Sequence, residues 1–497
     1  MTEELRDRWA KFLWAALLVC LPITSFKYIP LLGAGTVVRP LAIYPLLLLL
    51  PLISLRYLKK GARNPFSGGV YLLVLLVLSV LISSAIGGIT PPVDLGGVNY
   101  LDRVVRSLVT LAVGVAFFLS AVEMNRTVED VKFSVRWLIV GLVLTLFWAM
   151  VQFVGLNSGY RGELNKIQNL FSIRGLVKNK RSSGFAFEPS WLAGQLATLY
   201  LPWLFATFIH NFKPWKNHIF SKHPVISTIT NYIDPLNTLL LAASVVVLFF
   251  TYSRSGLAMV LVGVMITYLF TGKTQLLSIW RWFLLGFRRE QKKQLDLRKL
   301  MLRVVIVIMI IGIITSAGFF LADKGYIAAF AQNNAESIVD YLQNAYLGPR
   351  FAYIDAGLSA FEEHPIFGVG FGASGFWVYQ NMPDWALAGN PEIASQLSPS
   401  TNIFPNPKNL LVRFLAETGI LGFSIYLVFL IYMISITLKL IRWQDPEQRS
   451  GYNWIGTAGL FGMVTIFLLC FSQDSLAMPE IWILPGILTG IFSNKVN

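Results

Sequence analysis

The chain has 497 residues and a formal net charge of +15, and it is 55% hydrophobic but only 13% charged. Soluble domains carry about 25% charged residues, so this composition excludes an ordinary soluble domain. In a membrane protein an excess of lysine and arginine gathers in the cytoplasmic loops, which makes nucleic-acid binding a poor explanation of the charge.

Long apolar runs recur along the whole chain. Runs of about 17–25 residues have the length that a membrane-crossing helix needs, and about 12 of them are expected here. The runs are continuous, so they predict an all-α integral membrane protein with a single polytopic domain, residues 1–497. The expected spans lie near residues 11–31, 37–55, 69–88, 104–122, 135–155, 189–210, 235–252, 255–272, 300–321, 409–437, 452–471 and 477–493.

Lysine and arginine gather in alternate connections between these spans, and such connections face the cytoplasm. Both termini are therefore expected there, together with the basic loop 273–299, whose tryptophans suit an interfacial helix. The opposite, outer side has two long loops, about 156–188 and 322–408. Short helices are expected in the second loop, around 335–346 and 350–363, and this loop is long enough to cap the outer face.

The first outer loop is basic on the face where positive charge is usually sparse. Its charge is either simply solvated or forms a cationic surface for an anionic ligand. The residues are Arg161, Lys166, Arg174, Lys178, Lys180 and Arg181.

The stretch RSSGFAFEPSWL begins at Arg181, just outside the expected span 189–210. Pro189 suits the first position of a helix. Glu188 precedes it and has two possible roles. It either stabilises the helix end through the helix dipole or, because acidic residues at membrane depth are rare and mostly functional, takes part in catalysis.

Arg254 lies in the connection TYSRSG, which joins two apolar spans. A guanidinium in this position either pairs with a neighbouring carboxylate or binds an anionic substrate group, for which its planar fork is well shaped.

A helical run from Arg350 is expected to end at His364, because a proline follows. The glycines of GVGFG then allow a tight turn close to another element or to a ligand. Arg350 is a candidate anion contact. For His364 the helix-end role is favoured over a role as a ligand.

In the stretch TNIFPNPKNLLVRFLAETGILG the two prolines disfavour a helix before Lys408. Lys408, Asn409, Arg413 and Glu417 then follow at helical spacing. Lys408 and Arg413 add positive charge, and Asn409 offers an amide to a phosphate or a sugar hydroxyl. Glu417 either pairs with Arg413 within the helix or takes part in catalysis.

The outer face therefore has more cationic than acidic candidates, which suits a diphosphate ligand. No group of His, Cys and Asp has the spacing of a metal site, so neither a metal nor another cofactor is expected. The cations are Arg181, Arg254, Arg350, Lys408 and Arg413, and the carboxylates are Glu188 and Glu417.

Four pieces, RSSGFAFEPS, TYSRSG, the run R…FxxHPxxGVGxG and NLLVRFLAETGILG, follow in this order between the expected spans. Together they resemble the O-antigen ligase and polymerase superfamily of bacterial envelope glycosyltransferases, over about residues 181–425. The resemblance implies a GT-C-type enzyme of the bacterial cytoplasmic membrane. It would act on the outer face and use sugar chains carried on undecaprenyl diphosphate. It also implies contact with membrane lipids and, for polymerases, a chain-length-regulating membrane protein as partner.

Ligases of this superfamily have a histidine just before the asparagine that matches Asn409, where this chain has Lys408. The Glu-Pro-Ser element looks more like the polymerases. The resemblance therefore implies polymerisation of lipid-linked repeat units into an envelope polysaccharide or exopolysaccharide, with a ligase that transfers glycan to lipid A core as the alternative.

The mechanism that the resemblance implies is metal-independent and inverting. Arg181 and Arg254 would hold the diphosphate, with Lys408 as an electrostatic contact, and would stabilise the charge that develops on the leaving group. A base should take the proton of the attacking sugar hydroxyl. Glu188 is the first candidate, followed by His364 and Glu417.

A transporter of anions or of lipid-linked sugars is the rival from another class. It predicts inverted repeats and helices broken at mid-membrane, and the sequence indicates neither. The candidate charges gather at one end of the spans, which suits an outer-face enzyme better.

Overall fold

The structure is a computed structural model that describes residues 2–28, 36–57, 67–176, 180–212, 235–272, 337–344, 347–389, 391–398 and 404–496. These residues are helical apart from loops and isolated β-bridges. In chain order the helices are α1 (Glu3–Cys20), α2 (Ile43–Tyr57), α3 (Gly68–Gly87), α4 (Tyr100–Met124), α5 (Val128–Asn157), α6 (Arg161–Phe171), α7 (Pro189–Gln195), the π-helical η2 (Leu196–Tyr200), α8 (Leu201–His210), α10 (Pro235–Phe250), α11 (Arg254–Thr271), α15 (Ile338–Asn344), α16 (Gly348–Glu363), α17 (Ser374–Gln380), α18 (Asp384–Gly389), α19 (Pro391–Gln396), α20 (Leu410–Ile441), α21 (Arg449–Leu469) and α22 (Glu480–Val496).

Within the described ranges, seven helical stretches are long and apolar enough to cross a membrane. The protein is thus a multi-pass helical membrane protein, whereas the expected count of about twelve spans stays a prediction. The seven are Gly68–Gly87, Tyr100–Met124, Val128–Asn157, Pro189–His210, Arg254–Thr271, Leu410–Ile441 and Arg449–Leu469. Shorter apolar helices cover Ile43–Leu55, Pro235–Phe250 and Glu480–Ser493, and the expected span 300–321 lies outside the described residues.

The first expected span, 11–31, is wrong in its position. Helix α1 begins at Glu3 and ends at Cys20. Pro22 follows at once, and a proline lacks the N–H that would continue the helix. The chain then turns into an extended segment, where the backbone N–H of Phe26 donates to the carbonyl of Arg39 at 2.7 Å.

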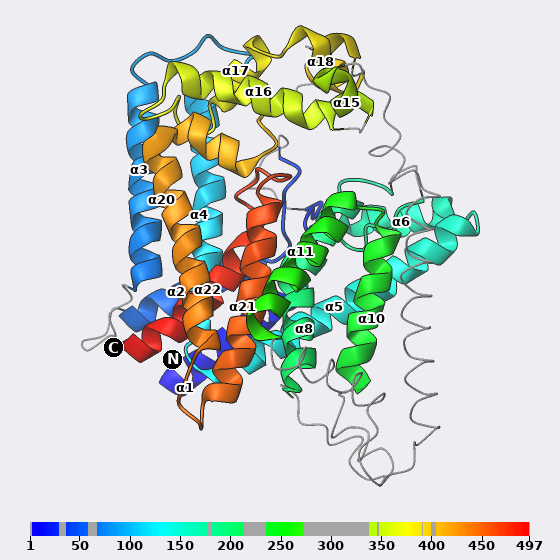
Figure 1. The fold of residues 1–497 in the computed structure, drawn as a ribbon, viewed down its shortest axis with the longest axis vertical. Coiled ribbons are helices and arrows are strands. Elements are labelled where there is room, and N and C mark those ends of the chain that lie inside the picture. Colours follow the sequence, from blue (N-terminus) through cyan, green and yellow to red (C-terminus); the bar gives the residue numbers. More distant parts are fainter. Residues whose placement is uncertain are drawn as a thin grey trace, which may run out of the picture.

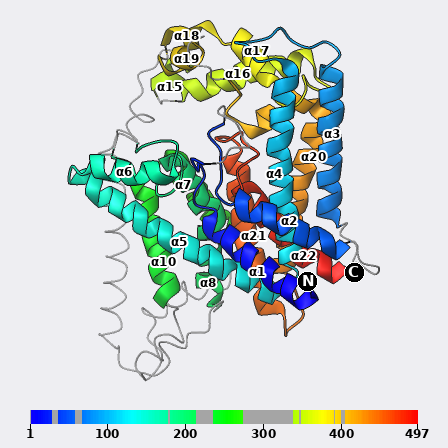
Figure 2. The same cartoon turned by 180° about the vertical axis from the view of Figure 1, so that it is seen from behind.

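Helices α20 and α21 pack against each other, and each also packs against other helices. Helix α20 packs against α3 and α21, helix α22 packs against α4, and α21 packs against α8 and α11. Figures 1 and 2 show both chain termini at the end of this bundle that lies away from α15–α19. We call α15–α19 the loop helices. We call the end of the bundle that lies opposite the chain termini the loop end. Helix α16, of the loop helices, packs directly against α20.

Candidate functional site

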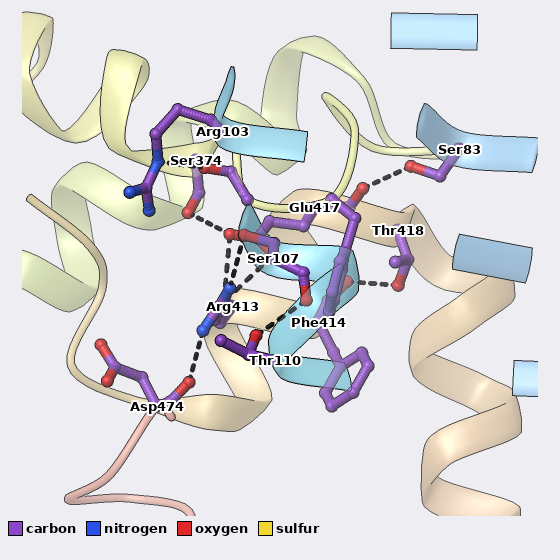
Figure 3. A network of polar contacts seen from close by, with 12 residues as sticks. Ser83, Arg103, Ser107, Thr110, Ser374, Arg413, Phe414, Glu417, Thr418 and Asp474 are labelled. Atoms are coloured by element: carbon purple, nitrogen blue, oxygen red, sulfur yellow. Dashed lines mark hydrogen bonds and ion pairs between the residues drawn. The ribbon is translucent and has the colours of Figure 1, made fainter. Parts of the chain in front are cut away.

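A buried ion pair lies near the loop end of α20. Arg413 and Glu417 are one helical turn apart, and their side chains are 8% and 1% exposed. The Nε of Arg413 donates to both carboxylate oxygens of Glu417 at 3.1 Å. Figure 3 shows the two side chains pointing toward one another. The intrahelical pairing that the sequence allowed for Glu417 is thus the arrangement that the structure contains.

Residues from three further elements complete this pair. The hydroxyl of Ser374, on α17, donates to Glu417 Oε1 at 2.8 Å. Arg413 donates through Nη1 to the backbone carbonyl of Asp474 at 2.6 Å and through Nη2 to Ser107 Oγ, on α4, at 3.4 Å. Because both oxygens of Glu417 already accept hydrogen bonds from a buried cation, the carboxylate is held as an ion-pair partner. This geometry does not favour Glu417 as the base.

A break in α20 fixes the position of Glu417. Gly419 has φ 61° and ψ −167°, so the helix is interrupted there. The loop 365–370 replaces the missing helical hydrogen bonds. The N–H groups of Val369 and Gly370 donate to the carbonyls of Ala416 and Glu417 at 3.0 and 3.1 Å, and the N–H of Ile420 donates to the carbonyl of Pro365 at 2.9 Å. Backbone groups at a helix break must find partners in a membrane protein, and the glycine-rich loop supplies them here.

The glycines of this loop are required by its backbone and by its close packing. Gly370 has φ 97°, and a Cβ added to it would overlap the hydroxyl of Tyr100. That hydroxyl donates to the carbonyl of Ser84 at 2.8 Å, so it is not free to move away. The tight turn that the sequence predicted for GVGFG is thus a close approach to other protein elements.

We predict that Gly370→Ala destabilises the protein far more than Gly159→Ala. Gly159 has φ 88°, but a Cβ there meets no atom within 4 Å. Both variants incur the backbone strain of a left-handed residue, about 1–2 kcal/mol, and only Gly370→Ala adds the clash. The midpoint of thermal unfolding in detergent, measured by size-exclusion fluorescence, checks this. Equal midpoints for the two variants would mean that the loop yields without cost.

Lys408 and Asn409 both have structural partners. The Oδ1 of Asn409 accepts from the N–H groups of Leu411 and Val412 at 3.0 and 3.2 Å, so this residue caps α20. The Nζ of Lys408 donates to Gln396 Oε1 at 2.7 Å and lies 4.1 Å from the ring centroid of Tyr353. Lys408 therefore ties the start of α20 to the loop helices α16 and α19.

Asp474 joins these two parts of the site from the connection between α21 and α22. Its Oδ2 accepts from the backbone N–H of Lys408 at 3.1 Å, while its carbonyl accepts from Arg413. Burial raises the pKa of the Asp474 carboxyl above its ordinary value, although the charge of Arg413 acts in the opposite direction.

Arg181 and the connection that contains Arg254 form a second group. The N–H of Ser182 donates to the carbonyl of Phe250 at 3.0 Å, and the Nε of Arg181 donates to the carbonyl of Thr251 at 2.7 Å. Arg254 is the first residue of α11, whose N-cap is Ser253. The stretches RSSGF and TYSRSG, about 70 residues apart along the chain, thus lie side by side.

Glu188 precedes α7, the helix that packs against α11. It occupies the N-cap position of α7, but its side chain makes no capping hydrogen bond. Its carboxylate pairs with Arg174 Nη1 at 3.2 Å and accepts from the hydroxyl of Ser190. The side chain is 33% exposed. Glu188 is therefore a reachable carboxylate held by an arginine, in contrast to the enclosed Glu417.

The end of α21 lies between the two groups. Leu469 contacts the position of Gly194 on α7, and Gly256 on α11 packs against Ala193. On the other side, the N–H of Leu410 donates to the carbonyl of Cys470 at 2.7 Å. The starts of α7, α11 and α20 are therefore brought to the same end of the bundle, and Figure 1 shows the end of α21 beside the starts of α11 and α20.

His364 and Arg350 lie at opposite ends of α16, and both are exposed. His364 is the exposed C-cap of α16, and its ring packs edge-on against Trp377 with centroids 5.7 Å apart. This agrees with the helix-end role favoured for it. Arg350 is exposed in the first turn of the same helix.

Sequence reasoning missed three residues of the buried network, namely Ser107, Ser374 and Asp474, and also missed Arg103 beside it (Figure 3). An arginine at the start of an apolar span and an acidic residue shortly after another were signals that could have pointed to Arg103 and Asp474. Ser107 and Ser374 gave no such signal, because only the fold brings their hydroxyls to the ion pair.

A comparison with protein-family models matches residues 239–427 to the family described as O-antigen ligase. The matched region contains Arg254, Arg350, His364 and the stretch from Lys408 to Glu417, and it ends shortly after the break in α20. A comparison with curated proteins gave no match.

Proposed function

We propose that this chain, which its residues 239–427 identify as a member of the O-antigen ligase and polymerase superfamily, polymerises glycan repeat units carried on undecaprenyl diphosphate. The reaction takes place on the outer face of the cytoplasmic membrane, and both termini face the cytoplasm. Members of the family are glycosyl-transferring enzymes. The loop helices cap the outer face, and a chain-length-regulating membrane protein is the expected partner.

One observation carries this proposal, namely the junction between the segment that begins at Arg181 and the connection that holds Arg254. The two segments come from different parts of the chain, and each contains an arginine, with Arg254 at the start of α11. Arginine forks suit the oxygens of a diphosphate, which can accept from several donors at once. The proposed role of both residues is to hold the diphosphate and to stabilise its charge as it leaves.

Glu188 is the proposed base that takes the proton from the attacking sugar hydroxyl. Its carboxylate lies at the start of α7, which packs against α11, and is partly exposed, so a substrate hydroxyl can reach it. Glu417 is enclosed by its bonds to Arg413, and His364 lies at the exposed end of α16. The sugar carbon is attacked from the side opposite the diphosphate, so its configuration inverts. The donor is already activated, so the proposed reaction needs neither a nucleotide nor a metal.

The contacts of Lys408 favour a polymerase over the alternative, a ligase. Where ligases of the superfamily have a histidine, this chain has a lysine whose ammonium donates to Gln396 and lies over Tyr353. An ammonium group has no lone pair with which to accept a proton, so in this form Lys408 acts through its charge.

Two helical spans are irregular: α20 breaks at Gly419, and a π-helical turn lies within the Pro189–His210 span. Broken helices are a mark of transporters, where freed backbone groups line a substrate site. At Gly419 the freed groups pair with loop 365–370 instead. The break therefore supports a fixed ion pair, and the enzyme remains the preferred proposal over a transporter.

The proposal is tested with purified protein in detergent and its native lipid-linked repeat unit as the sole substrate, without nucleotide or metal. A gel should show a ladder of longer lipid-linked glycans. If glycan is transferred only after lipid A core is added, the protein is a ligase. If folded protein transfers glycan to neither acceptor, the enzyme proposal fails. Transport of the repeat unit across the membrane of proteoliposomes should then be measured.

A further inference from the structure

Arg103 is held rigidly beside the buried ion pair but is not part of it. It lies in the first turn of α4, and its Nε donates to the carbonyl of Gly372 at 3.4 Å. Its guanidinium lies over the ring of Phe404, 4.0 Å from the centroid, and Phe404 packs edge-on against Phe376. Figure 3 draws no dashed line between Arg103 and the Arg413–Glu417 pair. A stacked arginine keeps its fork of N–H groups oriented.

The two terminal nitrogens of Arg103 donate to no acceptor among the residues that the structure describes, and no carboxylate there forms an ion pair with it. The neighbouring arginines do have such partners. Arg413 pairs with Glu417, and Arg106 lies 4.0 Å from Asp102. Among the residues that the structure describes, the charged groups around Arg103 comprise four cations and three carboxylates, a formal excess of one positive charge. The cations are Arg103, Arg106, Arg413 and Lys408, and the carboxylates are Asp102, Glu417 and Asp474.

We infer that Arg103 binds a carboxylate of an acidic sugar in the glycan substrate, at a subsite formed with Phe404 beneath the loop helices. This inference rests on the proposed function. One guanidinium matches one carboxylate in charge and in its two-pronged geometry. A diphosphate carries more negative charge and has its proposed cations, Arg181 and Arg254, in the other group. The aromatic rings beside Arg103 also provide apolar faces against which a sugar ring can lie.

The test uses the repeat oligosaccharide released from its carrier lipid by mild acid, before and after its carboxyl groups are reduced to alcohols. Inorganic diphosphate is the third probe. Binding of each probe to the full-length protein in nanodiscs is measured by thermophoresis for wild type, Arg103→Gln, Arg103→Lys and Arg106→Gln. Arg106 is the matched control, because it lies on the same helix, is exposed, and has Asp102 as its partner.

We expect Arg103→Gln to raise the dissociation constant of the native oligosaccharide about 10- to 100-fold, the effect of losing a charge-assisted hydrogen-bond pair. Carboxyl reduction should have a similar effect on wild type and no further effect on Arg103→Gln. Arg103→Lys should recover part of the affinity, and Arg106→Gln should bind as wild type does. Diphosphate binding should not change in any of them.

Three results would overturn the inference. They are a native oligosaccharide without carboxyl groups, equal binding of the native and reduced forms to wild type, and loss of diphosphate binding in Arg103→Gln. The third would assign Arg103 to the carrier lipid. Thermal unfolding of each variant shows whether it is folded. If Arg103→Gln does not fold, the Arg103→Lys variant still tests the inference. If wild-type protein still forms the glycan ladder, any of these three results contradicts the role of Arg103 and leaves the proposed function intact.

Discussion

Arg254→Ala should abolish the ladder of lipid-linked glycans that wild-type protein forms, with a turnover number about 100- to 1,000-fold lower. Arg254 starts α11, next to the segment that carries Arg181, so its proposed role is to stabilise charge on the departing diphosphate. That charge is greater in the transition state than in the bound substrate. The loss should therefore fall mainly on the turnover number and less on the Michaelis constant.

Two variants show whether the effect is specific. Lys166→Ala removes a positive charge from an exposed position on α6, in the same basic loop as Arg181. It should leave turnover within about twofold of wild type, because exposed charges at a distance are screened by salt. Arg254→Lys keeps the charge but loses the two-pronged fork, so intermediate turnover is expected. If Lys166→Ala and Arg254→Ala reduce turnover equally, Arg254 contributes only to the general electrostatic field.

Much of the helical scaffold could be predicted from the sequence, because long apolar runs have few alternatives to a membrane helix. Positions set by local chemistry were less certain. The end of α1 at Cys20 depends on Pro22, and the start of α20 depends on the capping oxygen of Asn409. The amide of Asn409 is a candidate contact for substrate, and in the structure its oxygen caps the start of α20. The same side-chain chemistry serves both roles, and only the fold distinguishes them.

The buried network could be predicted only in part, because its partners are distant along the chain. The pairing of Arg413 with Glu417 followed from their one-turn spacing. Nothing local predicted that Asp474 and Ser374 would complete the pair. The break at Gly419 likewise depends on loop 365–370, about 50 residues earlier, which supplies the replacement hydrogen bonds. A pattern of apolar residues does not contain such long-range pairings.

Arg413→Leu should lower the free energy of unfolding by about 3–5 kcal/mol, because it leaves Glu417 buried without its cation. The double variant Arg413→Leu with Glu417→Leu should recover most of this loss, since two apolar side chains of suitable size replace a buried ion pair at little net cost. The free energy of unfolding is measured by titration with sodium dodecyl sulfate in mixed micelles, followed by fluorescence. The proteins compared are wild type, Arg413→Leu, Glu417→Leu and the double variant.

The double-mutant cycle separates a structural pair from a catalytic one. A structural pair requires that the two single losses greatly exceed the loss in the double variant. The recovery should be incomplete, because Ser374 then loses its acceptor and the carbonyl of Asp474 loses its donor. Single losses that simply add would show that Arg413 and Glu417 are not coupled. If Arg413→Leu instead unfolded like wild type but failed to elongate glycan, Arg413 would act on substrate, and the buried pair would belong to the binding site for the glycan.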